Sequence, residues 1–326
     1  MKKVFVTGGS GFIGTNLVQE LRSRGCEVLN FDIQAPLEPR HQPYWRKGDI
    51  LQREDLREVM EAFSPDWVMH LAGRAECDEN TTVEEGYQAN TDGVANLLHA
   101  LEGAPPERLL MVSSQYVCGP GRQPDHDQDY FPATVYGQSK VITEQLTRNA
   151  RLACAWTIVR PVNIWGPYHI RYSREFWKIA AMGLYVHPDV PAPVRTYGYV
   201  GNVVWQMLGL LEAPAPAVDR GVFYVGDHPI RIDQWSLGFA RALSGRNPPR
   251  VPLVAMKGIA KAGDAISRVT GKPFFLTSSR LQSMTIDYLS PIDATEALLG
   301  PAPWSLEEGI QETVAWFRAR GKKEKA

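Results

Sequence analysis

Residues 2–14 read KKVFVTGGSGFIG, and this stretch decides the fold. The β-branched run at 2–7 predicts a buried strand, and the glycines after it predict a tight turn into a helix. Gly8, Gly11 and Gly14 stand at GxxGxxG spacing. Glycine lets the backbone turn sharply and approach a pyrophosphate, while the helix N-terminus offers free N–H groups and a positive dipole end. The stretch therefore predicts a dinucleotide-binding strand, turn and helix.

Strands and helices alternate through the first half of the chain. Beyond the opening strand, we expect strands at 27–32, 44–49, 67–72, 109–114 and 156–163, and helices at about 53–63, 81–102 and 134–152. Because such alternation produces right-handed βαβ crossovers, it predicts a parallel sheet with helices on both faces. The predicted fold class is α/β, a Rossmann doubly wound parallel sheet with a smaller C-terminal substrate-binding lobe.

After Gly166-Pro167 the alternation stops and proline becomes frequent. GVFYVG (221–226) predicts a late strand that returns to the main sheet. We therefore predict an NAD-binding Rossmann domain at 1–167, with returning segments near 196–204 and 221–226, and a mainly substrate-binding lobe at 168–326. The helices of this second half are expected at about 173–183, 202–212, 232–243, 253–269 and 305–319.

The composition excludes several classes of protein. With 35 basic and 36 acidic residues among 326, the chain has no overall charge that would direct it to nucleic acid or to an anionic membrane. No apolar run approaches the ~20 residues that cross a bilayer, and no motif predicts a metal site. Cysteines without CxxC spacing indicate free thiols in a reducing cytosol, so we predict a cytoplasmic protein. These cysteines are Cys26, Cys77, Cys118 and Cys154.

Acidic residues at strand ends indicate which dinucleotide binds. Asp32 ends the second strand, 18 residues after Gly14, where a carboxylate can accept both ribose hydroxyls of an adenosine. A 2′-phosphate would meet this carboxylate with like charge, so NAD is favoured over NADP. Asp49 closes the third strand and is expected to hydrogen-bond the adenine amino group. Small residues in HLAG (70–73) let the dinucleotide lie close to the backbone, whereas His70 is expected to be a buried histidine with hydrogen-bonding partners.

Seven motifs follow one another along the first half of the chain: TGGSGFIG (7–14), GDI (48–50), HLAG (70–73), NTDGVANLL (90–98), SSQYVCG (113–119), YGQSK (136–140) and RPVNIWGP (160–167). Their order resembles that of the extended short-chain dehydrogenase/reductases, in particular the nucleotide-sugar epimerase/dehydratase family. The resemblance implies NAD as cofactor and a homodimer formed by the helices near 81–102 and 134–152. Together with the glycine turn and the two acids, it implies this cofactor-binding set: Gly8, Gly11, Phe12, Ile13, Gly14, Asp32, Asp49, Ile50, Leu71, Ala72, Gly73, Asn90, Tyr136, Lys140 and Pro161.

Tyr136 and Lys140 have YxxxK spacing at the start of a helix, so both side chains lie on one face, one turn apart. A free tyrosine, with a pKa of about 10, is only ~0.1% ionised at neutral pH. The Lys140 ammonium and the positive nicotinamide are expected to lower this pKa. Such a tyrosine can take a proton from a sugar hydroxyl while hydride leaves the same carbon for NAD⁺. Ser114 is expected to join the substrate oxygen to Tyr136, and Lys140 to hold the nicotinamide ribose. These three are the candidate catalytic residues.

The pair Gln115-Tyr116 indicates which reaction is absent. In the 4,6-dehydratases of the family these positions are typically an aspartate and a glutamate, the acid and base that eliminate water. Neither residue here is a carboxylate, so dehydration lacks its chemistry. We expect Tyr116 to form the pocket wall beside the sugar ring, and a second acid/base role for it is the alternative.

Two further segments are expected to bind substrate. Asn163 in RPVNIWGP resembles the asparagine that touches the diphosphate of a nucleotide sugar, and Arg195 in VRTYGYVGN resembles the arginine that clamps its phosphates; Gln115 and Tyr116 complete the predicted substrate-binding set. The family commonly has two aspartates shortly after that arginine, where this chain reads YGYVGN. The segments 254–267 and 273–284 look slightly like the hydroxysteroid-dehydrogenase branch of the same superfamily.

The sequence thus favours an NAD-dependent nucleotide-sugar epimerase that transiently oxidises a sugar hydroxyl through Tyr136, Lys140 and Ser114. An NAD(H)-dependent dehydrogenase or ketoreductase acting on a keto sugar or a steroid-like alcohol is the alternative. A 4,6-dehydratase is disfavoured by Gln115-Tyr116, and a non-catalytic dinucleotide sensor would need no proton donor. We predict a small-molecule substrate, and no metal, nucleic acid or membrane partner.

Overall fold

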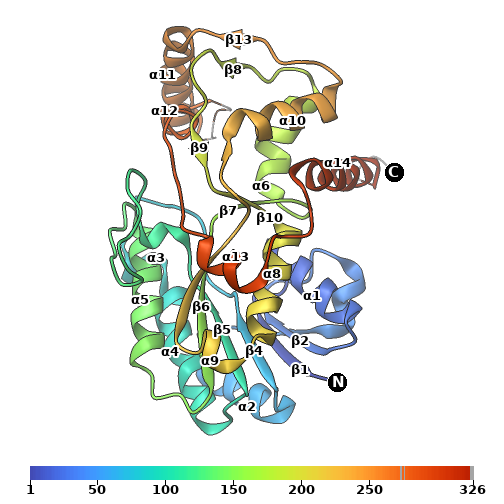
Figure 1. Ribbon diagram of the computed structural model, residues 1–326, viewed down its shortest axis with the longest axis vertical. Helices are drawn as coiled ribbons and strands as arrows, with labels where there is room; N and C mark the ends of the chain where they lie inside the picture. Colours follow the sequence, from blue (N-terminus) through green and yellow to red (C-terminus); the bar gives the residue numbers. More distant parts are fainter. Residues whose placement is uncertain (272–273, 275, 324–326) are drawn as a thin grey trace.

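The computed structural model describes residues 1–271, 274 and 276–323, and a seven-stranded sheet forms its centre (Figure 1). The strand order is β11-β6-β5-β4-β1-β2-β3, and every neighbouring pair is parallel. The predicted α/β doubly wound fold is confirmed. The strands are β1 (Lys3–Thr7), β2 (Glu27–Asp32), β3 (Trp45–Lys47), β4 (Trp67–His70), β5 (Arg108–Val112), β6 (Ala155–Pro161) and β11 (Gly221–Val225).

The side chains of β1 show why helices cover both faces of this sheet. Val4 and Val6 point to one face and Phe5 to the other, since side chains alternate along a strand, and all three are fully buried. One face is covered by α1 (Phe12–Ser23) and α8 (Val200–Glu212). The other is covered by α2 (Arg53–Phe63), α4 (Gln88–Gly103) and α5 (Val135–Asn149).

Two predicted elements are each divided in the structure. The predicted helix at 81–102 forms α3 (Val83–Gly86) and α4, because the backbone of Tyr87 leaves the helical conformation (φ −128°, ψ 29°) while its ring is buried and its hydroxyl donates to the carbonyl of Glu76. The predicted strand at 156–163 forms β6 and β7 (Asn163–Trp165). The second piece pairs with β10 (Tyr197–Tyr199), so it leaves the main sheet.

The smaller lobe lies at one end of the molecule and the main sheet at the other (Figure 1). β11 joins the edge of the main sheet beside β6, and α8 packs beside α1, where the sequence predicts returning segments. The boundary at residue 167 stays a prediction, and residues 272, 273, 275 and 324–326 of the predicted lobe lie outside the described residues. The predicted helix at 173–183 begins earlier, as α6 (Ile170–Tyr172), and continues through a π-helical segment, η3 (Ser173–Trp177), into α7 (Lys178–Ala181).

The remaining elements are short strands and helices that complete both parts. They are η1 (Pro39–Tyr44), η2 (Gln115–Val117), β8 (His187–Pro188), β9 (Val194–Arg195), α9 (Ala215–Val218), β12 (Ile230–Arg231), α10 (Ile232–Ser244), β13 (Arg250–Val251), α11 (Leu253–Thr270), α12 (Ser278–Ser283), α13 (Asp293–Leu299) and α14 (Leu306–Lys323). All four cysteines are free thiols, as predicted. Within the described part of the chain, no helix combines the length and the apolar character needed to cross a bilayer.

Candidate active site

A cavity of about 600 Å³ lies between the main sheet and the smaller lobe, and most of the predicted site residues line it. From the main sheet's side it is lined by the glycine turn, by residues that follow β4, β5 and β6, and by α5. The predicted residues on its wall are Gly8, Gly11, Phe12, Ile13, Gly14, Leu71, Gly73, Ser114, Tyr116, Tyr136, Lys140, Pro161, Asn163 and Arg195. Six other predicted residues are not on this wall: Asp32, Asp49, Ile50, Ala72, Asn90 and Gln115.

The glycine turn needs glycine at two positions for steric reasons. Gly8 has φ +74°, in the left-handed region, and a Cβ there would lie 2.5 Å from the backbone nitrogen of Ala72. A Cβ on Gly14 would lie 2.2 Å from the carbonyl oxygen of Gly8. Gly11 is the N-cap of α1 and has no side chain to cover the first N–H groups of the helix. The turn therefore presents free backbone donors to the cavity.

Asp32 and Asp49 lie at strand ends beside the turn, as their positions in the sequence predict. The Asp32 carboxylate accepts hydrogen bonds from the backbone N–H groups of Ser10 and Gln34, both at 2.9 Å. Burial raises the pKa of Asp32, and these hydrogen bonds oppose the rise. Asp49 accepts from the N–H of Leu51 at 3.0 Å. Asp32 is thus tied to the glycine turn itself, through Ser10.

Asn90 and His70 make hydrogen bonds to other residues of the protein. The Asn90 side chain accepts from the N–H of Arg74 and donates to Ser139 Oγ at 2.8 Å, which joins the loop after β4 to α5. His70 is fully buried, and its Nδ1 shares a hydrogen bond of 2.7 Å with Thr7 Oγ1. Burial lowers the pKa of His70 to about 3, so the imidazole is neutral. Its Nε2 has no partner among the described residues, so the predicted hydrogen bonding is only half made.

Ser114, Tyr136 and Lys140 converge on the cavity from two elements. Thr134 caps α5 by accepting a hydrogen bond from the N–H of Gly137 at 3.0 Å, and this starts the helix that carries Tyr136 and Lys140 one turn apart. Ser114 follows β5 and lies beside Tyr136, and its Oγ accepts the backbone N–H of Tyr116 at 3.2 Å. The Lys140 ammonium donates to the carbonyl oxygen of Val112 at 3.0 Å. The three side chains therefore line one stretch of wall.

The pKa of Tyr136 does not follow the sequence expectation. Burial raises this pKa above that of a free tyrosine, and the nearby Ser114 hydroxyl only partly opposes the rise. In the protein alone the pKa of Tyr136 is therefore raised, and the lowering expected beside a bound nicotinamide stays a prediction. Burial also lowers the pKa of Lys140 to about 8, and the charge of Glu144 limits that fall.

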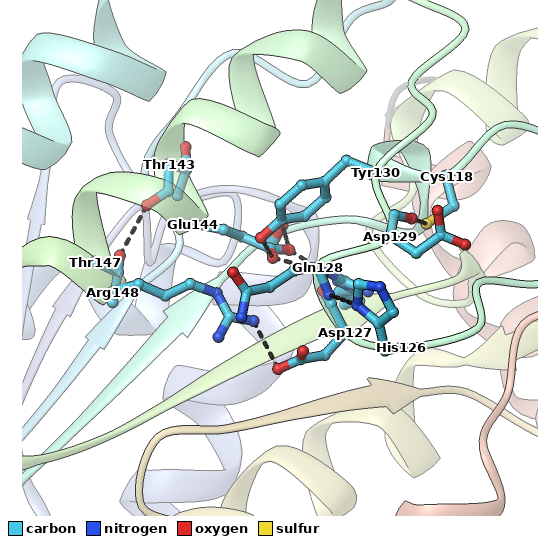
Figure 2. A network of polar contacts seen from close by, with 12 residues as sticks. Cys118, His126, Asp127, Gln128, Asp129, Tyr130, Thr143, Glu144, Thr147 and Arg148 are labelled. Atoms are coloured by element: carbon cyan, nitrogen blue, oxygen red, sulfur yellow. Dashed lines mark hydrogen bonds and ion pairs between the residues drawn. The ribbon is translucent and has the colours of Figure 1, made fainter.

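Glu144 anchors a buried network one helical turn beyond Lys140. Its carboxylate accepts from Ser113 Oγ at 2.6 Å and from the Arg160 guanidinium at 2.8 Å, and both members of this ion pair are almost completely buried. Figure 2 shows Tyr130 turned toward Glu144, with its hydroxyl at 2.9 Å. The network fixes α5 against β5, β6 and the loop that carries Tyr130. The spacing of Tyr136, Lys140 and Glu144, four residues each, is the sequence signal that could have identified Glu144.

The predicted substrate-binding residues separate into two groups. Tyr116, Asn163 and Arg195 line the cavity, and the Tyr116 ring lies edge-on to Tyr136 with centroids 5.7 Å apart. Gln115 is buried, and its side-chain oxygen accepts from the hydroxyl of Ser290 at 3.0 Å.

Arg195 is a buried cation on the cavity wall. Its exposed fraction is 8%, and its Nε donates to the carbonyl oxygen of Ile286 at 3.1 Å. Among the described residues, no carboxylate lies within ion-pair distance of it. Burying an unpaired charge is costly, so this guanidinium favours an anionic group in the cavity.

Apart from Arg195, the predicted site residues do not include the wall that the smaller lobe provides. Glu175 accepts from Arg171 at 3.3 Å and from Arg280 at 2.7 Å, which links η3 to α6 and α12 across the cavity rim. No motif predicts these contacts, because Glu175 and Arg280 are more than a hundred positions apart in the sequence. The rest of this wall is largely aromatic and aliphatic: Tyr172, Phe176, Ile179, Leu184, Tyr185, Val186, Tyr197, Ile232, Trp235, Met256, Leu276 and Met284.

Comparisons with known proteins agree with this geometry. The model of the NAD dependent epimerase/dehydratase family matches residues 4–226. N-acetyl-alpha-D-glucosaminyl-diphospho-ditrans,octacis-undecaprenol 4-epimerase of Escherichia coli O157:H7 is 25% identical over 98% of this chain and 97% of its own. 3-beta-hydroxysteroid dehydrogenase of Mycolicibacterium neoaurum is 32% identical, over 50% of this chain and only 48% of its own length. The structure of UDP-glucuronic acid 4-epimerase from Bacillus cereus, with UDP-glucuronic acid and NAD, superimposes with a TM-score of 0.75 at 18% identity and covers 98% of this chain and 99% of its own.

Proposed function

The chain belongs to the NAD-dependent epimerase/dehydratase family, an enzyme family whose cofactor is NAD, and on that premise we propose that it is an epimerase of diphosphate-linked sugars. One observation carries the proposal. The cavity that holds Ser114, Tyr136 and Lys140 also holds Arg195, a buried guanidinium without a carboxylate partner among the described residues. The first three suit hydride and proton transfer at a carbinol carbon, and the fourth suits a diphosphate.

The residues on the main-sheet wall fit NAD. The free N–H groups at the start of α1 can hold the pyrophosphate, and Gly8, Gly11 and Gly14 line the cavity there without side chains. Each oxygen of Asp32 accepts one backbone N–H and keeps a lone pair for a ribose hydroxyl. A 2′-phosphate would face the same carboxylate with like charge, which favours NAD over NADP.

The three side chains of the site then have distinct tasks. When bound, NAD would supply the hydride acceptor and, in its reduced form, the hydride donor. Tyr136, as phenolate, accepts the proton of the sugar hydroxyl and returns it when the ketone is reduced on its other face. Ser114 would hold the reacting oxygen by hydrogen bonding, and the Lys140 ammonium would hold the nicotinamide ribose.

No carboxylate among the described cavity-lining residues is free to act as the base of a dehydration. The side-chain oxygen of Gln115 accepts a hydrogen bond from Ser290, and Tyr116 forms part of the cavity wall. Among the described residues that line the cavity, Glu175 is the one carboxylate, and it is held by Arg171 and Arg280. A carboxylate neutralised by two guanidiniums is a poor base. These contacts support epimerisation over loss of water.

A second candidate function is supported by the apolar half of the cavity. Phe176, Leu184, Trp235 and Met256 leave a surface suited to a large apolar alcohol, and one relative is a hydroxysteroid dehydrogenase. A net dehydrogenase would use the same Tyr136, but would release reduced cofactor after each turnover.

One experiment separates the two functions. The purified protein is incubated with a panel of nucleotide-linked and lipid-diphosphate-linked sugars, and with sterol alcohols plus NAD⁺. Inversion at one ring carbon, seen by NMR without accumulation of reduced nicotinamide, supports the epimerase. Stoichiometric formation of reduced nicotinamide with a sterol, and no inversion of any sugar, would replace it with the dehydrogenase.

We also propose that the protein is a cytoplasmic homodimer formed by α4 and α5. The four free cysteines suit a reducing compartment, and the two helices lie side by side on one face of the sheet. Sedimentation velocity of the purified protein tests this, with a dimer expected and a concentration-independent monomer contradicting it.

A further inference from the structure

Helix α11 lies at the outer edge of the smaller lobe, far from the main sheet (Figure 1). Its inner side is buried through Met256, Ala260 and Gly263, and packs on Leu276 and Leu281. Met256 and Leu276 also line the cavity. The inner side of α11 therefore forms part of the roof over the substrate end of the cavity.

The outer side of α11 is apolar and exposed. Val254 and Val269 are exposed by 83% and 87%, and Ile266 and Ile259 by 43% and 38%. At 100° per residue, these four and the small residues between them form one continuous arc of about 140° without a polar side chain. The small residues are Ala255, Gly258, Ala262 and Ala265, all exposed. A helix face of this kind in water marks a surface that meets something apolar.

A row of cations borders this arc. Lys257, Lys261 and Arg268 are exposed and follow one another along the same edge of the arc, at spacings of four and seven residues. Asp264 is the one acidic residue of α11, and its carboxylate is engaged by the N–H and hydroxyl of Ser278. The net charge of −1 for the whole chain hides this local positive edge.

We propose that α11 is an interfacial helix that docks the smaller lobe on an anionic phospholipid membrane. The acyl region accepts the arc of Val254, Ile259, Ile266 and Val269, and anionic headgroups complement the cation row. A lipid surface fits both features at once, since it is apolar below and negatively charged at its edge. Peripheral docking of this kind needs no spanning helix, and it revises the sequence expectation of no membrane partner.

Docking would also orient the cavity. The membrane would contact the outer side of α11, whose inner side carries Met256 beneath it. A substrate with an apolar tail could then reach the cavity's apolar end without crossing water. The docking itself does not rest on the proposed reaction, because vesicle binding is measured without turnover.

Vesicle flotation of the full chain tests the proposal. We expect binding to vesicles of phosphatidylcholine with phosphatidylglycerol, weaker binding at high salt, and little binding to phosphatidylcholine alone. Lys257→Glu with Lys261→Glu, and separately Val254→Asp with Val269→Asp, should each lower the partition coefficient by at least about tenfold. Two matched controls on exposed positions outside α11 should bind as the natural chain does: Arg53→Glu with Arg151→Glu, and Leu298→Asp.

Three results would overturn the proposal. The first is a natural chain that stays unbound with anionic vesicles. The second is unchanged binding by either pair of α11 variants, provided that circular dichroism and NAD-dependent thermal stabilisation show them folded. The third is conversion of a dimer to a monomer by Val254→Asp with Val269→Asp without loss of vesicle binding, which would assign the face to a second copy of the chain.

Discussion

The two walls of the cavity are built in different ways. The main-sheet wall consists of strand ends, a glycine turn and the first turns of two helices, and its polar groups are set by hydrogen bonds such as Asp32 to Ser10 and Lys140 to Val112. The lobe wall consists of aromatic and aliphatic side chains around Trp235, with cations at its rim. On the proposed function, we expect the first wall to carry the reaction and the second to carry the choice of substrate, so that the two properties can be changed independently.

Tyr136→Phe should have the largest effect, since it removes the group that moves the proton. We expect turnover to fall by about 10³–10⁴-fold with dinucleotide affinity nearly unchanged. Tyr116→Phe is the matched control on the neighbouring ring, and it should lower turnover by less than about tenfold if Tyr116 is only wall. Steady-state kinetics and calorimetric NAD binding measure both. Equal losses of turnover in the two variants would assign Tyr116 an acid/base role, and Tyr116 would then no longer be only part of the wall.

Glu144→Gln should be the most damaging change to stability on the main-sheet side. It leaves the buried Arg160 guanidinium without its counter-ion, and we expect the free energy of unfolding to fall by about 3–5 kcal/mol. Glu20→Gln, which breaks the exposed pair with Arg24, should cost no more than about 1 kcal/mol. Urea denaturation compares the two, and similar losses would mean that the buried network does not hold α5.

The same contrast explains what the sequence could and could not predict. Local sequence is enough to predict the glycine turn, Asp32, Ser114, Tyr136 and Lys140. At these positions the backbone geometry requires particular residue types at short, fixed spacings. Resemblance to family segments was the basis for predicting Tyr116, Asn163 and Arg195, and these three residues line the cavity. Gln115 was placed on the same ground, yet its side chain binds Ser290, a residue 175 positions away.

The lobe wall and the tyrosine's pKa lie beyond local sequence. Tertiary packing alone brings Leu276, Arg280 and Met284 close to residues near 175 and 185. In the sequence, Leu276 and Met284 cannot be distinguished from ordinary core residues. The pKa of Tyr136 depends on how deeply the ring is buried, which does not follow from YxxxK spacing.

Arg195→Leu should separate substrate binding from chemistry. Removing a buried guanidinium that meets a diphosphate should raise KM by about 10–100-fold, with a smaller change in kcat. Arg174→Leu, an exposed arginine in η3 that does not line the cavity, should leave both constants within about twofold. A loss in kcat alone for Arg195→Leu would place this residue at the reacting carbon and not at the phosphates.

The smallest effect expected is a pH limb from Lys140. Because burial lowers its pKa to about 8, the ammonium is present below that pH and is lost above it. The profile of kcat/KM, which reports the free enzyme, should therefore fall as pH rises through about 8. A profile that stays flat to about pH 10, where a free lysine titrates, would mean that Lys140 is not desolvated.

The fate of a deuterium label at the inverted carbon is the most direct test of hydride transfer to and from the bound cofactor. A substrate of the panel, labelled at that carbon, is converted by enzyme with unlabelled bound NAD, and the product is examined by NMR and mass spectrometry. If the hydride leaves and returns through the bound cofactor, the inverted product keeps the deuterium on the same carbon, with no net reduced nicotinamide and no loss of water. Washout of the label into solvent, or a product lighter by one water, would contradict hydride transfer through Tyr136 without a carboxylate partner.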